Sequence, residues 1–175
     1  PDDMPLGIDG CSAPVYGIPQ RNMAQAVALL ADPGGLDPDR AEACRKITRA
    51  MMANPVMVAG PGKFDTELMR IAGDKVFSKG GAEGYQILGV MPGVLDHDSP
   101  GVGIAIKIAD GDTLGRGRTT VSLKILSALG VLGSDELSQL EAFEFGAVPV
   151  KNWRKLEVGE VRPAFDLPDF TYREG

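Results

Sequence analysis

The segment Val102-Gly103-Ile104-Ala105-Ile106-Lys107-Ile108-Ala109 sets the fold class of this chain. Its branched apolar residues recur at every second position and Lys107 falls on the other face, which is the pattern of a β-strand with one buried side. Shorter apolar runs at residues 76–79 and 85–91 predict two more strands before it. Helical patterns lie on both sides of these runs, so the sequence predicts an α+β fold with an antiparallel sheet flanked by helices.

The helices are placed by apolar spacing and by their end signals. Residues 22–31 have an apolar face at helical spacing, with Asn22 as the expected N-cap. Asp37 followed by Pro38 is a typical helix start, and that helix continues to about residue 52, with Cys44 on its buried face. Further helices are expected over residues 64–72, 116–129 and 134–143. Residues 147–163 predict a strand pair or an extended tail, with Trp153 as its anchor.

Composition limits the classes of protein to which the chain can belong. Its 175 residues are enough for one domain with a real core. The net charge of −6 excludes nucleic acid and an anionic membrane as main partners, because no basic patch is available to neutralise phosphates. No apolar run reaches the ~18 residues of a membrane span. With two cysteines and no export signal, the expected location is the cytoplasm.

A carboxylate and a thiol lie two residues apart in Gly7-Ile8-Asp9-Gly10-Cys11-Ser12-Ala13-Pro14. In an extended segment, side chains at i and i+2 point to the same side, so Asp9 and Cys11 would face one cavity. The pair fits a metal site, or a nucleophile with an orienting acid. It also fits a turn that carries a structural cysteine, and the segment taken alone favours that turn.

Lys79 ends an apolar strand and is followed by Gly80 and Gly81. Burying an ammonium is costly without a partner, so a lysine at a buried strand end is a candidate base or a partner of a nucleophilic serine. The two glycines would let a substrate lie against the strand edge. The alternative is a lysine whose ammonium simply reaches solvent from the end of the strand.

Two other segments carry groups that bind ligands in other proteins. Residues 59–65, AGPGKFD, place a glycine loop before a helix, where anions bind well. The spacing of a P-loop is absent, so a structural loop is predicted. Asp96-His97-Asp98 holds the single histidine, but adjacent polar residues in a turn rarely converge on one metal ion, and a solvated loop is predicted there.

Three blocks of the sequence resemble the asparaginase II family, the rhizobial-type L-asparaginases. They are G-I-D-G-C-S-A-P at residues 7–14, V-A-G-P-G-K-F-D-T-E-L-M at 58–69 and K-G-G-A-E-G-Y at 79–85. Their order and approximate spacing are those of the family, and the resemblance covers essentially the whole chain. A-I-K-I-A-D-G-D at residues 105–112 also fits, whereas T-L-G-R-G-R after it departs from the usual arginine-rich continuation.

The resemblance implies a fold similar to that of the serine β-lactamases and penicillin-binding proteins, and hydrolysis of L-asparagine to L-aspartate and ammonia. The family's site uses serine–lysine pairs and a zinc held by two cysteines and a lysine. By position, Asp9 corresponds to the site aspartate and Cys11 to a zinc ligand. Lys79 corresponds to the lysine that partners the second serine, in a placement similar to the K-[ST]-G strand of β-lactamases. The positions expected to contact the substrate are Gly80, Gly81 and Glu83.

The family's S-x-x-K nucleophile motif and its C-S-G-K zinc segment belong to the N-terminal half, and neither occurs in this chain. We therefore expect residues 1–175 to be a single domain, the C-terminal half of such a protein. Alone it should be inactive, with an incomplete zinc site, and its partners should be the missing half and a second copy in a homo-oligomer. Two alternatives stay open: a non-catalytic module that binds a partner, and an amidase of another substrate. The sequence does not rank asparagine against glutamine.

Overall fold

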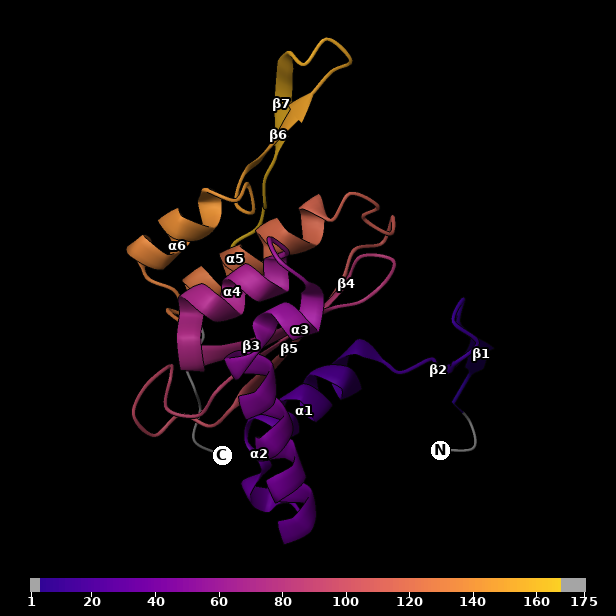
Figure 1. The fold of residues 1–175 in the computed structure, drawn as a ribbon, viewed down its shortest axis with the longest axis vertical. Helices are drawn as coiled ribbons and strands as arrows, with labels where there is room; N and C mark the ends of the chain where they lie inside the picture. Colours follow the sequence, from indigo (N-terminus) through magenta and orange to yellow (C-terminus); the bar gives the residue numbers. More distant parts are fainter. Residues whose placement is uncertain (1–3, 168–175) are drawn as a thin grey trace.

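The computed structural model describes residues 4–167 (Figure 1). The described strands form antiparallel sheets in the orders β1-β2, β3-β4-β5 and β6-β7, so the predicted α+β class is confirmed. Within the described residues, no helix is both long enough and apolar enough to cross a membrane. In chain order the elements are β1 (Leu6–Ile8), β2 (Pro14–Tyr16), α1 (Gln20–Ala31), the 3-10 helix η1 (Pro33–Gly35), α2 (Pro38–Ala53), α3 (Pro55–Ala59), α4 (Phe64–Ala72), the 3-10 helix η2 (Gly73–Lys75), β3 (Val76–Gly80), β4 (Tyr85–Val90), β5 (Val102–Lys107), α5 (Arg116–Ala128), α6 (Ser134–Glu141), β6 (Val148–Lys151) and β7 (Glu157–Val161).

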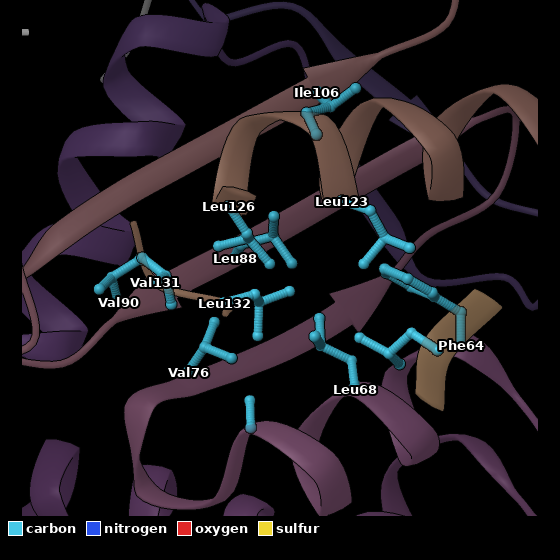
Figure 2. Packing of buried hydrophobic residues seen from close by; sticks show 12 residues of the cluster. Phe64, Leu68, Val76, Leu88, Val90, Ile106, Leu123, Leu126, Val131 and Leu132 are labelled. Carbon is cyan, nitrogen blue, oxygen red and sulfur yellow. The ribbon is translucent and has the colours of Figure 1, made fainter. Parts of the chain in front are cut away.

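The three-stranded sheet is covered by helices on both faces. Successive residues of β3 point to opposite sides, so Val76 packs in one apolar cluster and Phe77 in another. The first cluster joins the sheet to α4, α5 and α6, and Figure 2 shows Leu68, Leu88 and Leu132 within it. The second cluster joins the opposite face to α1 through Val27. The sheet therefore forms the middle layer of the fold.

Helix α1 packs directly on the backbone of the sheet, because glycines stand at the contact. Gly103 of β5 faces α1, and a Cβ there would overlap the carbonyl oxygen of Ala24. Gly89 pairs with Gly103 across β4 and β5, and a Cβ on Gly89 would overlap the ring of Phe77. These two glycines permit an approach that a larger residue would prevent.

The predicted helices and strands are present, with small shifts at their ends. The helix expected over residues 64–72 matches α4 at both ends. The carboxylate of Asp37 caps α2 by accepting from the Asp39 amide at 3.1 Å. The prediction that Asn22 caps α1 is wrong, because the helix already begins at Gln20. Cys44, expected in the core, is half-buried.

Two hairpins extend from the body of the molecule, as Figure 1 shows for β1–β2 and for β6–β7. Trp153 lies in the turn between β6 and β7 and is 99% exposed, so the prediction that it anchors the tail is wrong. The hairpin carries its turn away from the core, which leaves the indole nothing to pack against. Apolar surface is exposed, and much of it lies on these hairpins: Leu6, Ile8, Val15, Tyr16, Trp153, Leu156 and Val158.

Candidate functional site

Strand β3 lies at the edge of the central sheet and ends at Lys79 and Gly80, with Gly81 directly after it. The Gly81 amide donates to the carbonyl oxygen of Tyr85 at 2.8 Å and so continues the ladder toward β4. Amides of successive residues in a strand point in opposite directions, so the Gly80 amide points away from β4. It donates to Oδ2 of Asp65 in α4 at 2.7 Å. The end of β3 is therefore held from both sides.

Asp65 is the centre of a buried hydrogen-bond network between α4 and the sheet. The residue is 7% exposed, and its Oδ1 accepts from Ser78 Oγ at 2.5 Å and from Gln86 Nε2 at 2.7 Å. With the Gly80 amide, three donors point at one carboxylate. Asp65 also lies in the first turn of α4, where the helix dipole favours negative charge. These contacts compensate the cost of burying the carboxylate.

Arg118, in the first turns of α5, reaches the same strand end. Its Nη1 donates to the carbonyl oxygen of Gly81 at 2.8 Å, while its Nε is buried with no hydrogen-bond partner among the described residues. A Cβ on Gly80 would lie 3.2 Å from Arg118 Nη1 and 3.3 Å from Asp65 Oδ2. Side chains from α4 and α5 therefore converge on Gly80, where a side chain would crowd both.

The loop before α4 is held by the two residues that follow Asp65. Thr66 Oγ1 donates to the carbonyl oxygen of Gly60 at 2.6 Å, and the Gly62 amide donates to Glu67 Oε1 at 3.2 Å. Both glycines have positive φ, a backbone conformation that other residues rarely adopt. Residues 59–65 thus form a loop tied to α4 by side chains, in line with the prediction of a structural loop.

Lys79 points to the opposite face of β3 from Ser78 and is exposed. Its Nζ donates to the carbonyl oxygen of Gly80 at 2.5 Å. The expectation of a desolvated ammonium is wrong for this chain, and the alternative of a lysine that reaches solvent describes its side chain. The backbone of Lys79 is nevertheless well fixed, because the residues before and after it both donate to Asp65.

Glu83 lies in the turn between β3 and β4, with a φ of 56°. Its carbonyl oxygen accepts from Lys107 Nζ, and its Oε2 lies 2.8 Å from the position that a Cβ on Gly111 would take. No hydrogen bond in the described chain joins its carboxylate to Lys79. Tyr85 follows the turn, and burial raises the pKa of its phenol.

Asp9 and Cys11 lie together in the turn of the β1–β2 hairpin. The Cys11 thiol is 3.8 Å from Asp9 Oδ2, and the Asp9 amide donates to the carbonyl oxygen of Ala13 at 2.9 Å. The two side chains meet as their spacing predicts, but both are exposed and face solvent instead of a cavity. Figure 1 shows the hairpin standing apart from β3, so the structure does not bring Asp9 and Cys11 to Lys79.

The resemblance implies a zinc held by two cysteines and a lysine, and zinc sites in proteins have at least three protein ligands. Within residues 4–167, no three side chains of His, Cys, Asp or Glu lie close enough to hold a metal ion together. Of the ligand types that the resemblance implies, the β1–β2 turn offers the Cys11 thiol alone, so the described residues do not complete a zinc site. His97 and Asp98 contact each other at 2.8 Å with almost fully exposed side chains, consistent with the predicted solvated loop.

Comparison with known proteins places this chain in a class of enzymes, those that hydrolyse amide bonds. The model of the L-asparaginase II family matches residues 1–163, and the chain belongs to that family. The resemblance drawn from the three sequence blocks is thereby confirmed. A search of curated proteins gives no match.

The network around Asp65 is the part of this site that the sequence did not reveal. Asp65 stands in the block shared with the family, but its partners Ser78 and Gln86 are 13 and 21 residues further along the chain. One signal was available: Asp65 follows Phe64 directly and precedes Leu68 by three residues, a helical spacing that places it on the apolar face of α4, and all three are buried. A carboxylate on such a face needs donors from another element.

Proposed function

We propose that this chain forms one wall of an L-asparaginase site that uses serine and lysine. The observation that carries the proposal is the match of the L-asparaginase II family to residues 1–163. The fixed end of β3 supports it, because Lys79 leaves a rigid strand end with its ammonium open to a partner. Gly80 and Gly81 carry no side chains that would block the strand.

The reaction begins with a serine from residues outside this chain. Its Oγ attacks the side-chain amide carbon of L-asparagine and a lysine accepts the serine proton. The C–N bond then breaks, the nitrogen leaves as ammonia with that proton, and an acyl-enzyme remains. Water hydrolyses the ester and releases L-aspartate. In this scheme Lys79 hydrogen-bonds a second serine, Asp9 orients the substrate, and Gly80, Gly81 and Glu83 line its binding site.

Zinc is also part of the proposal, in a limited role. Cys11 would supply one thiolate ligand, and the remaining ligands would come from the same outside residues that supply the serine. Since the described residues do not complete the site, no step of the reaction is assigned to the metal.

The free thiols of Cys11 and Cys44 agree with the reducing cytoplasm that we propose as the location.

A second candidate is a module that binds a partner without catalysis. The exposed apolar residues of the β1–β2 hairpin favour it, among them Ile8 and Tyr16. Such a surface suits contact with the N-terminal half or with a second copy in a homo-oligomer. Under this alternative the residues around Lys79 have no chemical role.

The two candidates are separated by ammonia release. L-asparagine and L-glutamine are offered to the 175-residue chain and to a longer protein in which the N-terminal half that we propose precedes it. We expect the longer protein to release ammonia from L-asparagine and the chain alone to release none. Release by the chain alone would show that the nucleophile lies within it. Release by neither protein would leave the binding module as the better account.

A further inference from the structure

We propose that Asp65 is the positioning residue of Lys79, an inference that rests on the proposed role of Lys79 in amide hydrolysis. Asp65 does not touch the ammonium. It accepts from Ser78 Oγ at 2.5 Å and from the Gly80 amide at 2.7 Å, and these are the residues immediately before and after Lys79. One carboxylate thus holds the strand on both sides of the lysine.

The geometry of β3 explains why these two contacts fix the position of Lys79. Ser78 and Gly80 face the same side of the strand, and Lys79 faces the other. The Gly80 amide points away from β4, so no strand of the central sheet bonds it and Asp65 is its acceptor. Without that acceptor the last residue of an edge strand would be held from the β4 side only, and strand ends so held fray readily.

The hydrogen-bond network around Asp65 restrains three elements at once. Gln86 pairs with Gly80 across the sheet and donates to Asp65 at 2.7 Å, so α4, β3 and β4 meet at one buried carboxylate. A charged acceptor makes shorter and stronger hydrogen bonds than a neutral one. Replacing the carboxylate by an amide keeps the shape of the side chain but turns one acceptor into a donor, which faces the donors already present.

Glu67 supplies a matched control on the same helix. It is also buried, at 5% exposed, and it also accepts from a glycine amide, that of Gly62 at 3.2 Å. That glycine lies in the loop before α4 and not in β3. Glu67→Gln therefore makes the same chemical change, at a similar depth, without loosening the strand that carries Lys79.

The test uses the protein that releases ammonia from L-asparagine, carrying Asp65→Asn or Glu67→Gln. Misplacing a catalytic group by about 1 Å costs roughly a hundredfold in rate, so Asp65→Asn should lower kcat by about 10- to 100-fold. Because Gly80 also lines the proposed binding site, KM should rise as well, but by less than the fall in kcat. Glu67→Gln should leave both constants within about twofold of the unaltered protein.

Hydrogen exchange of the Gly80 amide is the second readout, and it does not depend on activity. Asp65→Asn should accelerate that exchange and Glu67→Gln should not. An unchanged Gly80 exchange rate overturns the inference whether or not the protein hydrolyses asparagine. An active protein whose kcat survives Asp65→Asn, or falls equally in both variants, also overturns it. Absence of activity in the unaltered longer protein is instead a failure of the proposed function.

Ser78→Ala is a milder variant that tests the same network even where Asp65→Asn does not fold. It removes one donor to Asp65 and replaces one small side chain with another, while the Gly80 contact remains. The variant also loses the bond that Ser78 Oγ accepts from Gln86 Nε2 at 2.9 Å, but Gln86 keeps its bond to Asp65, so kcat should fall by about two- to tenfold, less than in Asp65→Asn. A folded Ser78→Ala protein with full kcat would count against the network.

Discussion

The carboxylate of Asp65 and the amide of Gly80 meet at 2.7 Å, and this contact joins the first turn of α4 to the last residue of β3. It ties the block that contains the glycine loop to the block that contains Lys79. The two blocks are separate in the sequence, but in the fold they form one unit, in which a helix side chain completes the hydrogen bonding of a strand edge. This contact predicts the effect of a substitution at Gly80.

Gly80→Ala should destabilise the protein and lower its activity. The added methyl would lie 3.2 to 3.3 Å from Arg118, Asp65 and Gln86, closer than ordinary contacts. Crowding of this kind costs about 1–3 kcal/mol, measurable as a lower free energy of unfolding in urea. Any activity of the protein should fall with it, since the displaced groups hold the strand end.

Gly159→Ala is the control for that substitution. Gly159 also lies in a strand, β7, but no atom stands within 4 Å of where its Cβ would be. We expect its free energy of unfolding to change by less than about 0.5 kcal/mol. Equal effects of the two alanines would mean that Gly80 is not crowded.

The elements of this fold follow from local patterns in the sequence, whereas the contacts of the site do not. Alternation over residues 102–109 predicts β5 because the period of a strand is visible within a few residues. No pattern near Asp65 in the sequence predicts its contact with Gln86 on β4. The error at Trp153 has a related cause: a large apolar residue is usually buried, but burial depends on where the hairpin points.

The positions of the candidate site residues likewise follow from the sequence only where they depend on local structure. The two-residue spacing of Asp9 and Cys11 correctly predicts that their side chains meet, since that is a property of one short turn. Their separation from Lys79 depends on how the β1–β2 hairpin leaves the body, which no local pattern encodes (Figure 1). The exposure of Lys79 depends likewise on what covers the end of β3.

Glu136 should make stability depend on pH. Burial raises the pKa of Glu136, but hydrogen bonds from Lys75 and from the Gly133 amide, together with the charge of Lys75, outweigh burial and lower the pKa below its usual 4.5. A lowered pKa in the folded state adds stability above the unfolded value, and this is lost as the pH falls through the folded value. Glu136→Gln removes the charge and can still accept from Gly133.

Glu136→Gln should therefore reduce the free energy of unfolding at pH 7 by less than about 1 kcal/mol, because the ion pair with Lys75 is partly exposed. The difference from the unaltered protein should be smaller at pH 3 than at pH 7, because the carboxylate takes up a proton as the pH falls. Urea unfolding at both pH values measures it. Glu160→Gln, in the exposed pair with Arg162, is the comparison and should show little difference at either pH. A loss in Glu136→Gln that is as large at pH 3 as at pH 7 would contradict the assignment.

Trp153 offers a direct optical test of the C-terminal hairpin. It is the single tryptophan of the chain and is 99% exposed. Its fluorescence should already have the emission maximum of a solvated indole, and that maximum should hardly move when the chain unfolds. Trp153→Ala should change the free energy of unfolding by less than about 0.5 kcal/mol. A blue-shifted maximum in the native protein would place the indole against another surface, such as a second copy.

In the zinc site that we propose, Cys11 should be needed for zinc binding and Cys44 should not. Cys11 is exposed beside the Asp9 carboxylate, whereas Cys44 is half-buried on α2. Substitution of residues around a metal site weakens metal binding by about tenfold or more. Loss of a ligand itself should weaken zinc binding at least as much. Zinc per protein molecule, measured after dialysis of the intact protein, should therefore fall in Cys11→Ala and stay unchanged in Cys44→Ala. Equal zinc contents in the two variants would remove Cys11 from the ligand set and leave its turn with a structural role only.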